Sequence, residues 1–186
     1  IEAGTYAIAA AITGGKLELI DAPNNNLKAL IDYLRKIGVN IVKYSDGIEV
    51  DAPEKLYSCN LTTEVYPGFP TDLQAQAMAL MTISDGVSSI EEQIFENRFM
   101  HVSELLRFGA NIKITGNKAI IKGKKNLNGA QVMATDLRAS SSLVLAGLRA
   151  EGETVINRIY HLDRGYENLV QKLLQCGAII KRVKKN

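Results

Sequence analysis

Cysteine and histidine are scarce in this sequence, and long hydrophobic runs are missing. The 186 residues include two cysteines and two histidines. Cys59 and Cys176 are too few for a disulfide framework, which is consistent with a reducing compartment such as the cytoplasm. His101 and His161 lack the spacing of a metal site, so we expect no metal and no cofactor. No apolar run approaches the length of a membrane span or a signal peptide.

An excess of charge of one sign is also lacking. The net charge is +2, which argues neither for nucleic acid nor for a membrane as a partner. The densest basic cluster, residues 181–185, is interpreted first as the solvated end of a strand. The alternative is a noncatalytic repeat scaffold that binds polyanions through this end. That alternative predicts salt-sensitive nucleic-acid binding, which would be lost on trimming residues 181–186.

The sequence does contain an internal repeat. The phrase Thr-Asp-Leu opens two apolar segments, at residues 71–73 and 135–137, and a degenerate third copy begins at Glu2. Each copy carries two glycines, 23 or 25 residues apart, that we expect to end helices in the left-handed conformation: Gly15 and Gly38, Gly86 and Gly109, and Gly152 and Gly177. The repeat predicts three similar units within a single domain, at approximately residues 1–58, 59–126 and 127–186.

Hydrophobic periodicity predicts an α+β fold for these units. Residues 6–12, 75–81 and 143–148 are apolar nearly all round, which indicates helices buried on every side. Residues 27–34 and 166–173 have apolar positions on one face only. We therefore expect a pseudo-threefold domain with the apolar helices in the middle and mixed four-stranded sheets outside. Its strands are expected at residues 16–20, 39–44, 48–50, 59–65, 87–90, 110–115, 119–121, 130–134, 153–156 and 178–183, with hairpin turns at Asp46-Gly47 and Gly116-Asn117.

The first and last units fall short of this pattern. No strand precedes the buried helix of the first unit, and no hairpin partner follows residue 183. The chain also starts at Ile1 rather than at a methionine. We expect a piece of a longer polypeptide, whose other part supplies strands for the open edges.

Three arginines stand near the expected helix starts, where the helix dipole disfavours a cation. They are Arg98, Arg138 and Arg164. Threefold symmetry would bring them together with Asp72 and Asp136, which open two of the buried helices. Such a cluster could bind a phosphate or carboxylate, and a purely structural Asp–Arg network is an equal alternative.

Five blocks of sequence resemble a known family. Residues 1–5, 69–76, 94–102, 133–140 and 158–166 closely resemble the UDP-N-acetylglucosamine 1-carboxyvinyltransferases, in the same order. The resemblance implies one lobe of a two-lobed enzyme, built as an inside-out α/β barrel of three β-α-β-α-β-β units. The family's mobile-loop cysteine and its phosphoenolpyruvate-binding lysine belong to segments outside this chain, so the fragment alone is expected to be inactive.

The same resemblance implies an activity in peptidoglycan synthesis, and thereby in cell shape and division. The enzyme would transfer the enolpyruvyl group of phosphoenolpyruvate to the 3-hydroxyl of UDP-N-acetylglucosamine. Asp72 would bond that hydroxyl and take its proton, and Arg164 would bind phosphoenolpyruvate. Other positions matching the cleft or its substrate contacts are Thr71, Ile94, Phe95, Arg98, Asp136, Leu137 and Arg138. The partners implied are these two substrates and the second lobe, without nucleic acid or membrane.

A sister enzyme is the nearest alternative. The synthase of 5-enolpyruvylshikimate 3-phosphate shares the fold and the chemistry, but none of its shikimate-binding motifs is present in this sequence.

Overall fold

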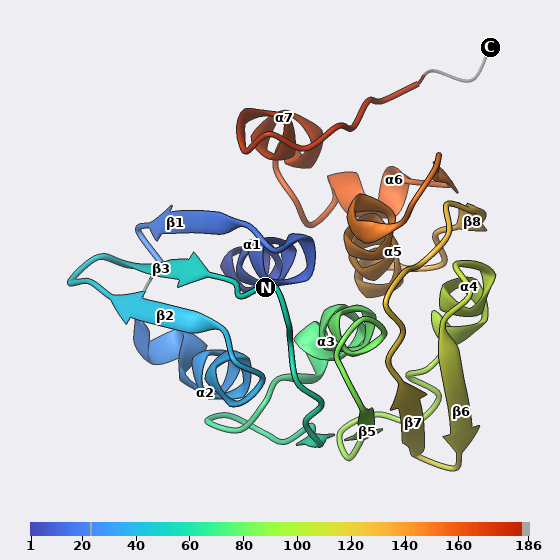
Figure 1. The fold of residues 1–186 in the computed structure, drawn as a ribbon, viewed down its shortest axis with the longest axis horizontal. Helices are drawn as coiled ribbons and strands as arrows, with labels where there is room; N and C mark the ends of the chain where they lie inside the picture. The colour runs from blue at the N-terminus through green and yellow to red at the C-terminus, as the bar shows by residue number, and fades with distance from the viewer. Residues whose placement is uncertain (23, 184–186) are drawn as a thin grey trace.

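Three buried helices form the centre of the computed structural model, which describes residues 1–22 and 24–183. They are α1 (Glu2–Thr13), α3 (Gln74–Met81) and α5 (Leu137–Arg149). Each packs against the other two, with strands and further helices outside them (Figure 1). Every residue of α3 is buried, as are residues 4–12 and 139–146. The predicted burial of the apolar helices is confirmed.

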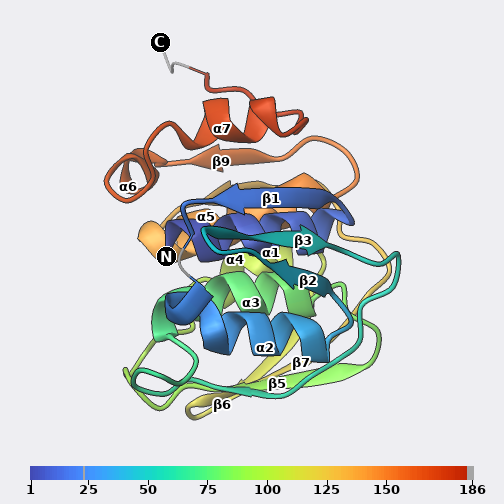
Figure 2. The same ribbon diagram turned by 90° about the vertical axis from the view of Figure 1, so that its left-hand side faces the viewer.

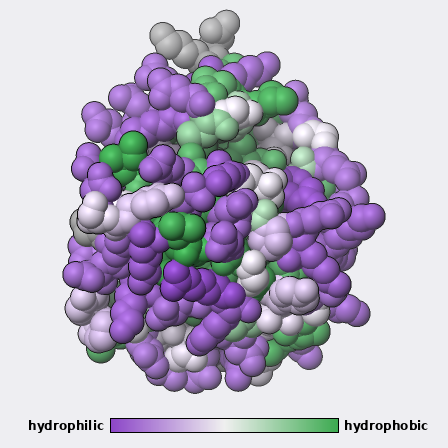
Figure 3. All heavy atoms as spheres, turned by 60° about the vertical axis from the view of Figure 1, so that its left-hand side comes forward, coloured by the Kyte–Doolittle hydropathy of each residue, from purple (hydrophilic) through white to green (hydrophobic). Residues whose placement is uncertain are grey.

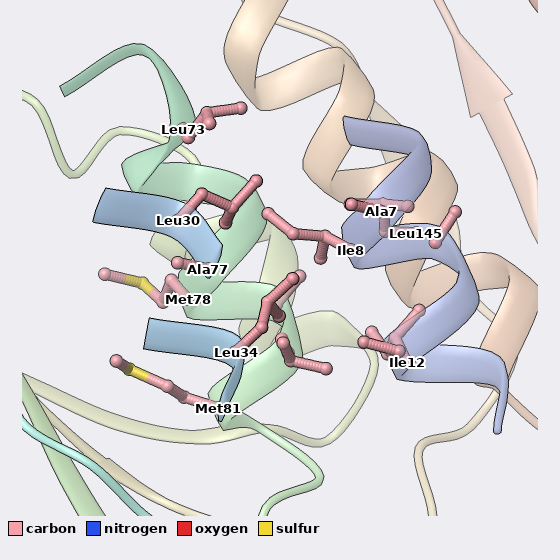
Figure 4. Packing of buried hydrophobic residues seen from close by; sticks show 14 of the residues in the cluster. Ala7, Ile8, Ile12, Leu30, Leu34, Leu73, Ala77, Met78, Met81 and Leu145 are labelled. Carbon is pink, nitrogen blue, oxygen red and sulfur yellow. The ribbon is translucent and has the colours of Figure 1, made fainter. Parts of the chain in front are cut away.

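The contacts of α1 show why an apolar helix belongs in the middle. In Figure 4, Ile8 of α1 points toward Leu30 and Leu34 of α2 (Lys28–Lys36), while Ala7 lies beside Leu145 of α5. All five side chains are at most 1% exposed. Burying a large aliphatic side chain stabilises a fold by about 1.5–3 kcal/mol. A helix enclosed by neighbours gains this free energy around its whole circumference.

The strands form three separate sheets. The first is antiparallel with the order β1-β3-β2, from β1 (Lys16–Ile20), β2 (Asn40–Lys43) and β3 (Gly47–Asp51). The second has the order β4-β5-β7-β6, from β4 (Leu61–Thr62), β5 (Val87–Glu91), β6 (Asn111–Thr115) and β7 (Lys118–Lys122). The third pairs β8 (Gln131–Met133) with β9 (Val155–Asn157) in parallel.

The second sheet alone has the predicted four strands. Its β4 and β5 are parallel and its other pairs antiparallel, so it is mixed as expected. The first sheet has three strands and the third has two within the described residues. The prediction of four strands was wrong for these two units, because strands have to be paired and partners for their open edges are not among the described residues.

Shorter helices cover the outside. Besides α2, they are η1 (Asn24–Leu27), η2 (Thr71–Leu73), α4 (Val102–Arg107), α6 (Tyr160–Asp163) and α7 (Leu169–Gln175). Figure 2 shows β5, β6 and β7 at one end of the molecule and β9 with α7 at the other, with α1 and α3 between them. The one-sided pattern of α2 is confirmed, since Leu30, Ile31 and Leu34 are buried while its charged residues face outward.

The strand predicted over residues 178–183 is absent. After α7 the chain continues without pairing as a strand (Figure 1). Ile180 still packs against the core, whereas Ile179 and Val183 are 101% and 71% exposed. Alternating apolar residues become a strand only where another strand supplies hydrogen bonds. Of the basic cluster, Lys184 and Lys185 lie outside the described residues, while Arg182 bonds Asp163 through two hydrogen bonds of 2.7 and 2.6 Å.

One predicted helix end is displaced by a residue. Gly14, and not Gly15, takes the left-handed conformation after α1, with φ of 69°. Its N–H bonds the carbonyls of Ala10 and Ala11 at the end of the helix. Gly38, Gly109 and Gly177 directly follow the C-caps of α2, α4 and α7 with positive φ, as predicted. Gly86 and Gly152 also have positive φ, but the prediction that they end α3 and α5 was wrong, because those helices end at the C-caps Thr82 and Ala150.

The surface is largely polar on the face drawn in Figure 3, with small hydrophobic areas among hydrophilic residues. None of the helices in residues 1–22 and 24–183 combines the length and the apolar character needed to cross a bilayer.

Candidate active site

Asp72 lies between two arginines that come from distant parts of the chain. Its Oδ1 accepts a hydrogen bond of 3.2 Å from Nη2 of Arg98 and one of 2.6 Å from Nε of Arg138. The three side chains are 36%, 19% and 31% exposed, respectively. An acid and two guanidinium groups from two of the predicted repeat units therefore meet at one partly buried position.

Local structure explains how each group reaches this position. Asp72 lies in η2, the turn that leads into α3, and Arg138 lies in the first turn of α5. Because α3 packs against α5, the two helix starts are neighbours. Arg98 belongs to the turn between β5 and α4, where Asn97 has φ of 54°.

Asp136 has the structural role that an acid at a helix start commonly has. Its Oδ1 accepts hydrogen bonds from the backbone N–H of Arg138 at 2.8 Å and of Ala139 at 3.1 Å, so it caps α5. Asp72 makes no such cap to α3. The two copies of the Thr-Asp-Leu phrase thus differ: one carboxylate binds backbone, and the other binds arginines.

The electrostatics of Arg98 reflect its surroundings. Burial lowers the pKa of this guanidinium, the neighbouring charge of Arg138 lowers it further, and Asp72 opposes both. The guanidinium also lies 4.6 Å from the ring centroid of Phe95, a cation–π contact. Arg98 is therefore held by the Asp72 carboxylate, by the Thr71 hydroxyl, which accepts a hydrogen bond of 3.2 Å from its Nε, and by the Phe95 ring.

Arg164 is placed differently from the other two arginines. It is exposed and ends α6, whereas α7 begins only at Leu169, so the expectation of a helix start was wrong here. Among residues 1–22 and 24–183, no ion pair joins it to Asp72. Its neighbour Gly165 packs on Leu137, since a Cβ added there would lie 2.5 Å from Leu137 Cδ1. The backbone next to Arg164 therefore contacts Leu137, the first residue of α5.

Two hollows border the cluster. A cavity of about 250 Å³ is lined by Thr71, Asp72 and Ile94, together with residues 25–30 and 64–68. Neither arginine lines this cavity. A second hollow, along residues 95–100, is lined by Phe95 and Arg98. Asp72 and Arg98, although bonded to each other, thus face different hollows.

Sequence reasoning missed Glu92. This glutamate is 3% exposed, and its Oε2 accepts a hydrogen bond of 2.9 Å from the Thr71 hydroxyl. The same hydroxyl oxygen accepts a hydrogen bond of 3.2 Å from Arg98 Nε. A signal was available, because Ser88, Ile90 and Glu92 alternate along β5 and its continuation. In a strand, residues two apart share a face, and Ser88 and Ile90 are both buried.

The buried side chain of Gln76 holds the backbone of Asp72 in place. Nε2 of Gln76 donates to the backbone carbonyl of Asp72 at 3.1 Å and to Thr5 Oγ1 at 3.3 Å. Gln76 thereby ties α1 to the turn that carries Asp72. Within the described ranges no three His, Cys, Asp or Glu side chains are grouped to hold a metal ion.

Comparison with known proteins identifies the family. Residues 1–173 match the EPSP synthase family (3-phosphoshikimate 1-carboxyvinyltransferase). The chain belongs to this family of enolpyruvyl transferases. It is 60% identical over 183 residues to UDP-N-acetylglucosamine 1-carboxyvinyltransferase 2 of Mesorhizobium japonicum, and 58% identical over 184 residues to the UDP-N-acetylglucosamine 1-carboxyvinyltransferase of Geobacter metallireducens. These matches cover 98% and 99% of the chain but only 44% of each relative.

Solved structures agree on the fold. The enolpyruvyl transferase NikO from Streptomyces tendae is similar with a TM-score of 0.85 and 26% identity, over 96% of this chain and 43% of that protein. An EPSP synthase from Acinetobacter baumannii gives a TM-score of 0.72 at 17% identity, over 99% of this chain and 43% of that protein, which shows the fold alone. The predicted α+β enolpyruvyl transferase-like fold is confirmed. The chain spans less than half the length of these relatives.

Proposed function

We propose that this chain forms one wall of the active site of a UDP-N-acetylglucosamine 1-carboxyvinyltransferase. The whole enzyme would transfer the enolpyruvyl group of phosphoenolpyruvate to the 3-hydroxyl of UDP-N-acetylglucosamine and release phosphate, in the cytoplasmic phase of peptidoglycan synthesis. The observation that carries the proposal is the Asp72 carboxylate held between Arg98 and Arg138 at the edge of a cavity. The names of relatives 55–60% identical support the choice of sugar nucleotide.

Asp72 is the proposed base. Both arginines bond its Oδ1, and within the part of the chain that the structure describes its Oδ2 accepts no hydrogen bond. Oδ2 could therefore receive the proton of the sugar hydroxyl as that oxygen bonds to C2 of phosphoenolpyruvate. General bases act at hydrogen-bond distance from the proton they remove. In this addition the C2–C3 double bond breaks and C3 takes up a proton. The resulting tetrahedral adduct would then lose a proton from C3 and release phosphate by cleavage of the C2–O bond to the phosphate, which restores the double bond.

The arginines are the proposed anion-binding groups. Arg138 uses only Nε toward Asp72, and among the described residues its two Nη groups have no hydrogen-bond partner, so both remain for a ligand. Arg164 is exposed next to Gly165, which contacts the start of α5, and we assign phosphoenolpyruvate binding to it. Planar guanidinium groups bind phosphate and carboxylate in two-point contacts, and they offset negative charge on the departing phosphate.

Further substrate contacts are proposed on both sides of Asp72. Thr71 and Ile94 line the same cavity as Asp72, and we assign the nucleotide sugar to it. Phe95 and Leu137 are proposed as secondary contacts, and Asp136 as a cleft residue that acts chiefly by capping α5. We also retain the proposal of three similar units, at residues 1–58, 59–126 and 127–186, completed by a second lobe.

The test is enolpyruvyl transfer with and without the rest of the enzyme. The 186-residue chain is assayed alone and after joining to the part of the Mesorhizobium relative that it does not match. We expect phosphate release only from the joined protein, with a loss of about 100-fold or more in Asp72→Asn. Enolpyruvyl transfer by the chain alone would contradict the proposal that it forms only one wall of the active site. Transfer to shikimate 3-phosphate in place of the sugar nucleotide would instead favour the sister synthase.

A further inference from the structure

Glu92 is a carboxylate buried beside the cluster without touching the cavity. It follows the last residue of β5 and is 3% exposed. Burying a charged group costs free energy unless hydrogen bonds replace the lost water. A position this enclosed therefore needs a dense set of donors.

Four donors surround it. Oε1 accepts hydrogen bonds from Thr63 Oγ1 at 2.8 Å and from the backbone N–H groups of Ile94 at 2.9 Å and Phe95 at 3.1 Å. Oε2 accepts one from Thr71 Oγ1 at 2.9 Å. All four groups donate, so the position is built for a side chain that only accepts. A carboxylate meets that requirement, while an amide would turn an N–H toward a donor.

These bonds fix segments that border the candidate site. Ile94 and Thr71 both line the cavity, and Phe95 lines the neighbouring hollow. One buried side chain thus ties together the turn that carries Asp72, the turn that leads to Arg98, and Thr63 beyond β4. Glu92 itself lines the second hollow but not the cavity, so a change at Glu92 would reach the cavity through Thr71 and Ile94.

The Thr71 hydroxyl connects Glu92 to Arg98. It has one proton, which it donates to Glu92, so its lone pairs are left to accept from Arg98 Nε at 3.2 Å. Arg98 then presents Nη2 to Asp72. We propose that Glu92 is a positioning residue, which orients the Thr71 hydroxyl so that Arg98 is held against Asp72. Its effect on turnover rests on the proposed function, whereas its effect on Arg98 does not.

The geometric test uses the 186-residue chain and follows exchange of the Arg98 Nε–H with water by nitrogen-15 NMR. In Glu92→Gln we expect this exchange to accelerate about tenfold or more, because Thr71 then accepts from the new amide and loses its fixed orientation. The matched control is Glu91→Gln, since Glu91 is an adjacent, half-buried glutamate paired with Lys118 at 3.8 Å. Unchanged exchange in Glu92→Gln would overturn the inference, whatever turnover shows.

The kinetic test uses the joined two-lobed protein. We expect Glu92→Gln to lower kcat by about ten- to a hundredfold with a smaller change in KM, and Glu91→Gln to change neither. Because Glu92 acts on Arg98 through Thr71, the Arg98 Nε–H should exchange no faster in Glu92→Gln combined with Thr71→Val than in Thr71→Val alone. Accelerations that multiply would overturn the link. If the unaltered joined protein gave no transfer while Arg98 exchange responded as expected, the proposed function would fail and the positioning role would stand.

A second pair of variants covers the case in which Glu92→Gln does not fold. Thr71→Val removes the hydroxyl but leaves three of the four Glu92 bonds, whereas Thr71→Ser keeps the hydroxyl. Fast Arg98 Nε–H exchange in the valine variant with slow exchange in the serine variant supports the link. Equal exchange in both variants contradicts it.

Discussion

Arg138 donates a hydrogen bond of 2.6 Å from Nε to Oδ1 of Asp72, although 66 residues separate them in the chain. The bond joins the first turn of α5 to the turn before α3, at the point where these two buried helices begin. Both side chains are about one-third exposed. Ion pairs at such positions add only about 0–1 kcal/mol to folding, so the energetic value of this one to the fold is small.

Replacing Arg138 should therefore separate activity from stability. We expect Arg138→Gln to change the free energy of unfolding by less than about 1 kcal/mol, measured by urea denaturation. In the joined two-lobed protein, phosphate release should fall by about 100-fold or more, because the variant loses both the contact to Asp72 and the Nη donors for an anion. Arg149→Gln, in the last turn of the same helix, is the control and should leave turnover intact. Equal turnover in the two variants would exclude Arg138 from the chemistry.

The helix α4 offers an internal comparison of buried and exposed leucines. Leu105 is fully buried and Leu106 is 46% exposed, although they are adjacent. Leu105→Ala should lower the free energy of unfolding by about 2–5 kcal/mol, through lost transfer free energy and a residual cavity. Leu106→Ala should lower it by about 0.5 kcal/mol or less. Urea unfolding of both variants checks the difference, and similar losses would contradict the placement of α4 against the core.

Hydrophobic pattern was sufficient to predict the centre of the fold. The eight residues of α3 are apolar or small except for Gln74 and Gln76, and such a segment has no face suited to water. The repeated Thr-Asp-Leu phrase likewise indicated that acids and arginines from different units would meet. Packing of α3 on α5 then brings Asp72 to Arg138.

Features set by distant partners could not be read from local sequence. Residues 178–183 have an alternating pattern, but nothing in that segment reveals whether a neighbouring strand is present. The alternation along β5 indicates that Glu92 shares a face with buried residues, but a glutamate is usually exposed. The donors that allow its burial come from residues about 20 to 30 positions away as well as from its own turn. Asp136 and Asp72 share a phrase, yet one caps a helix and the other binds arginines, a difference that only tertiary contacts create.

Gly123 is expected to be the least replaceable glycine near the second sheet. A Cβ added there would lie 1.6 Å from the backbone carbonyl oxygen of Ser84, which cannot move as a side chain could. Gly123→Ala should therefore destabilise the fold by about 3 kcal/mol or more. Gly116→Ala is the comparison, because Gly116 has φ of 60° with open space around it and should cost only about 1–2 kcal/mol. Thermal or urea unfolding ranks the two variants, and a larger loss for Gly116→Ala would contradict the close approach of Gly123 to Ser84.

His101 should make stability depend on pH in the acidic range. It is 3% exposed, its Nε2 has no hydrogen-bond partner among the described residues, and burial lowers its pKa from 6.5 to about 4. Between these values the unfolded chain binds a proton that the folded chain does not. The free energy of unfolding should therefore fall as the pH is lowered from 6.5 toward 4, by at most about 1 kcal/mol per pH unit from this group. Urea unfolding at several pH values should show a shallower slope in His101→Met than in the unaltered chain. Leu106→Ala, which removes no titratable group, should retain the original slope. An unchanged slope in His101→Met would mean that His101 does not resist protonation in the folded state.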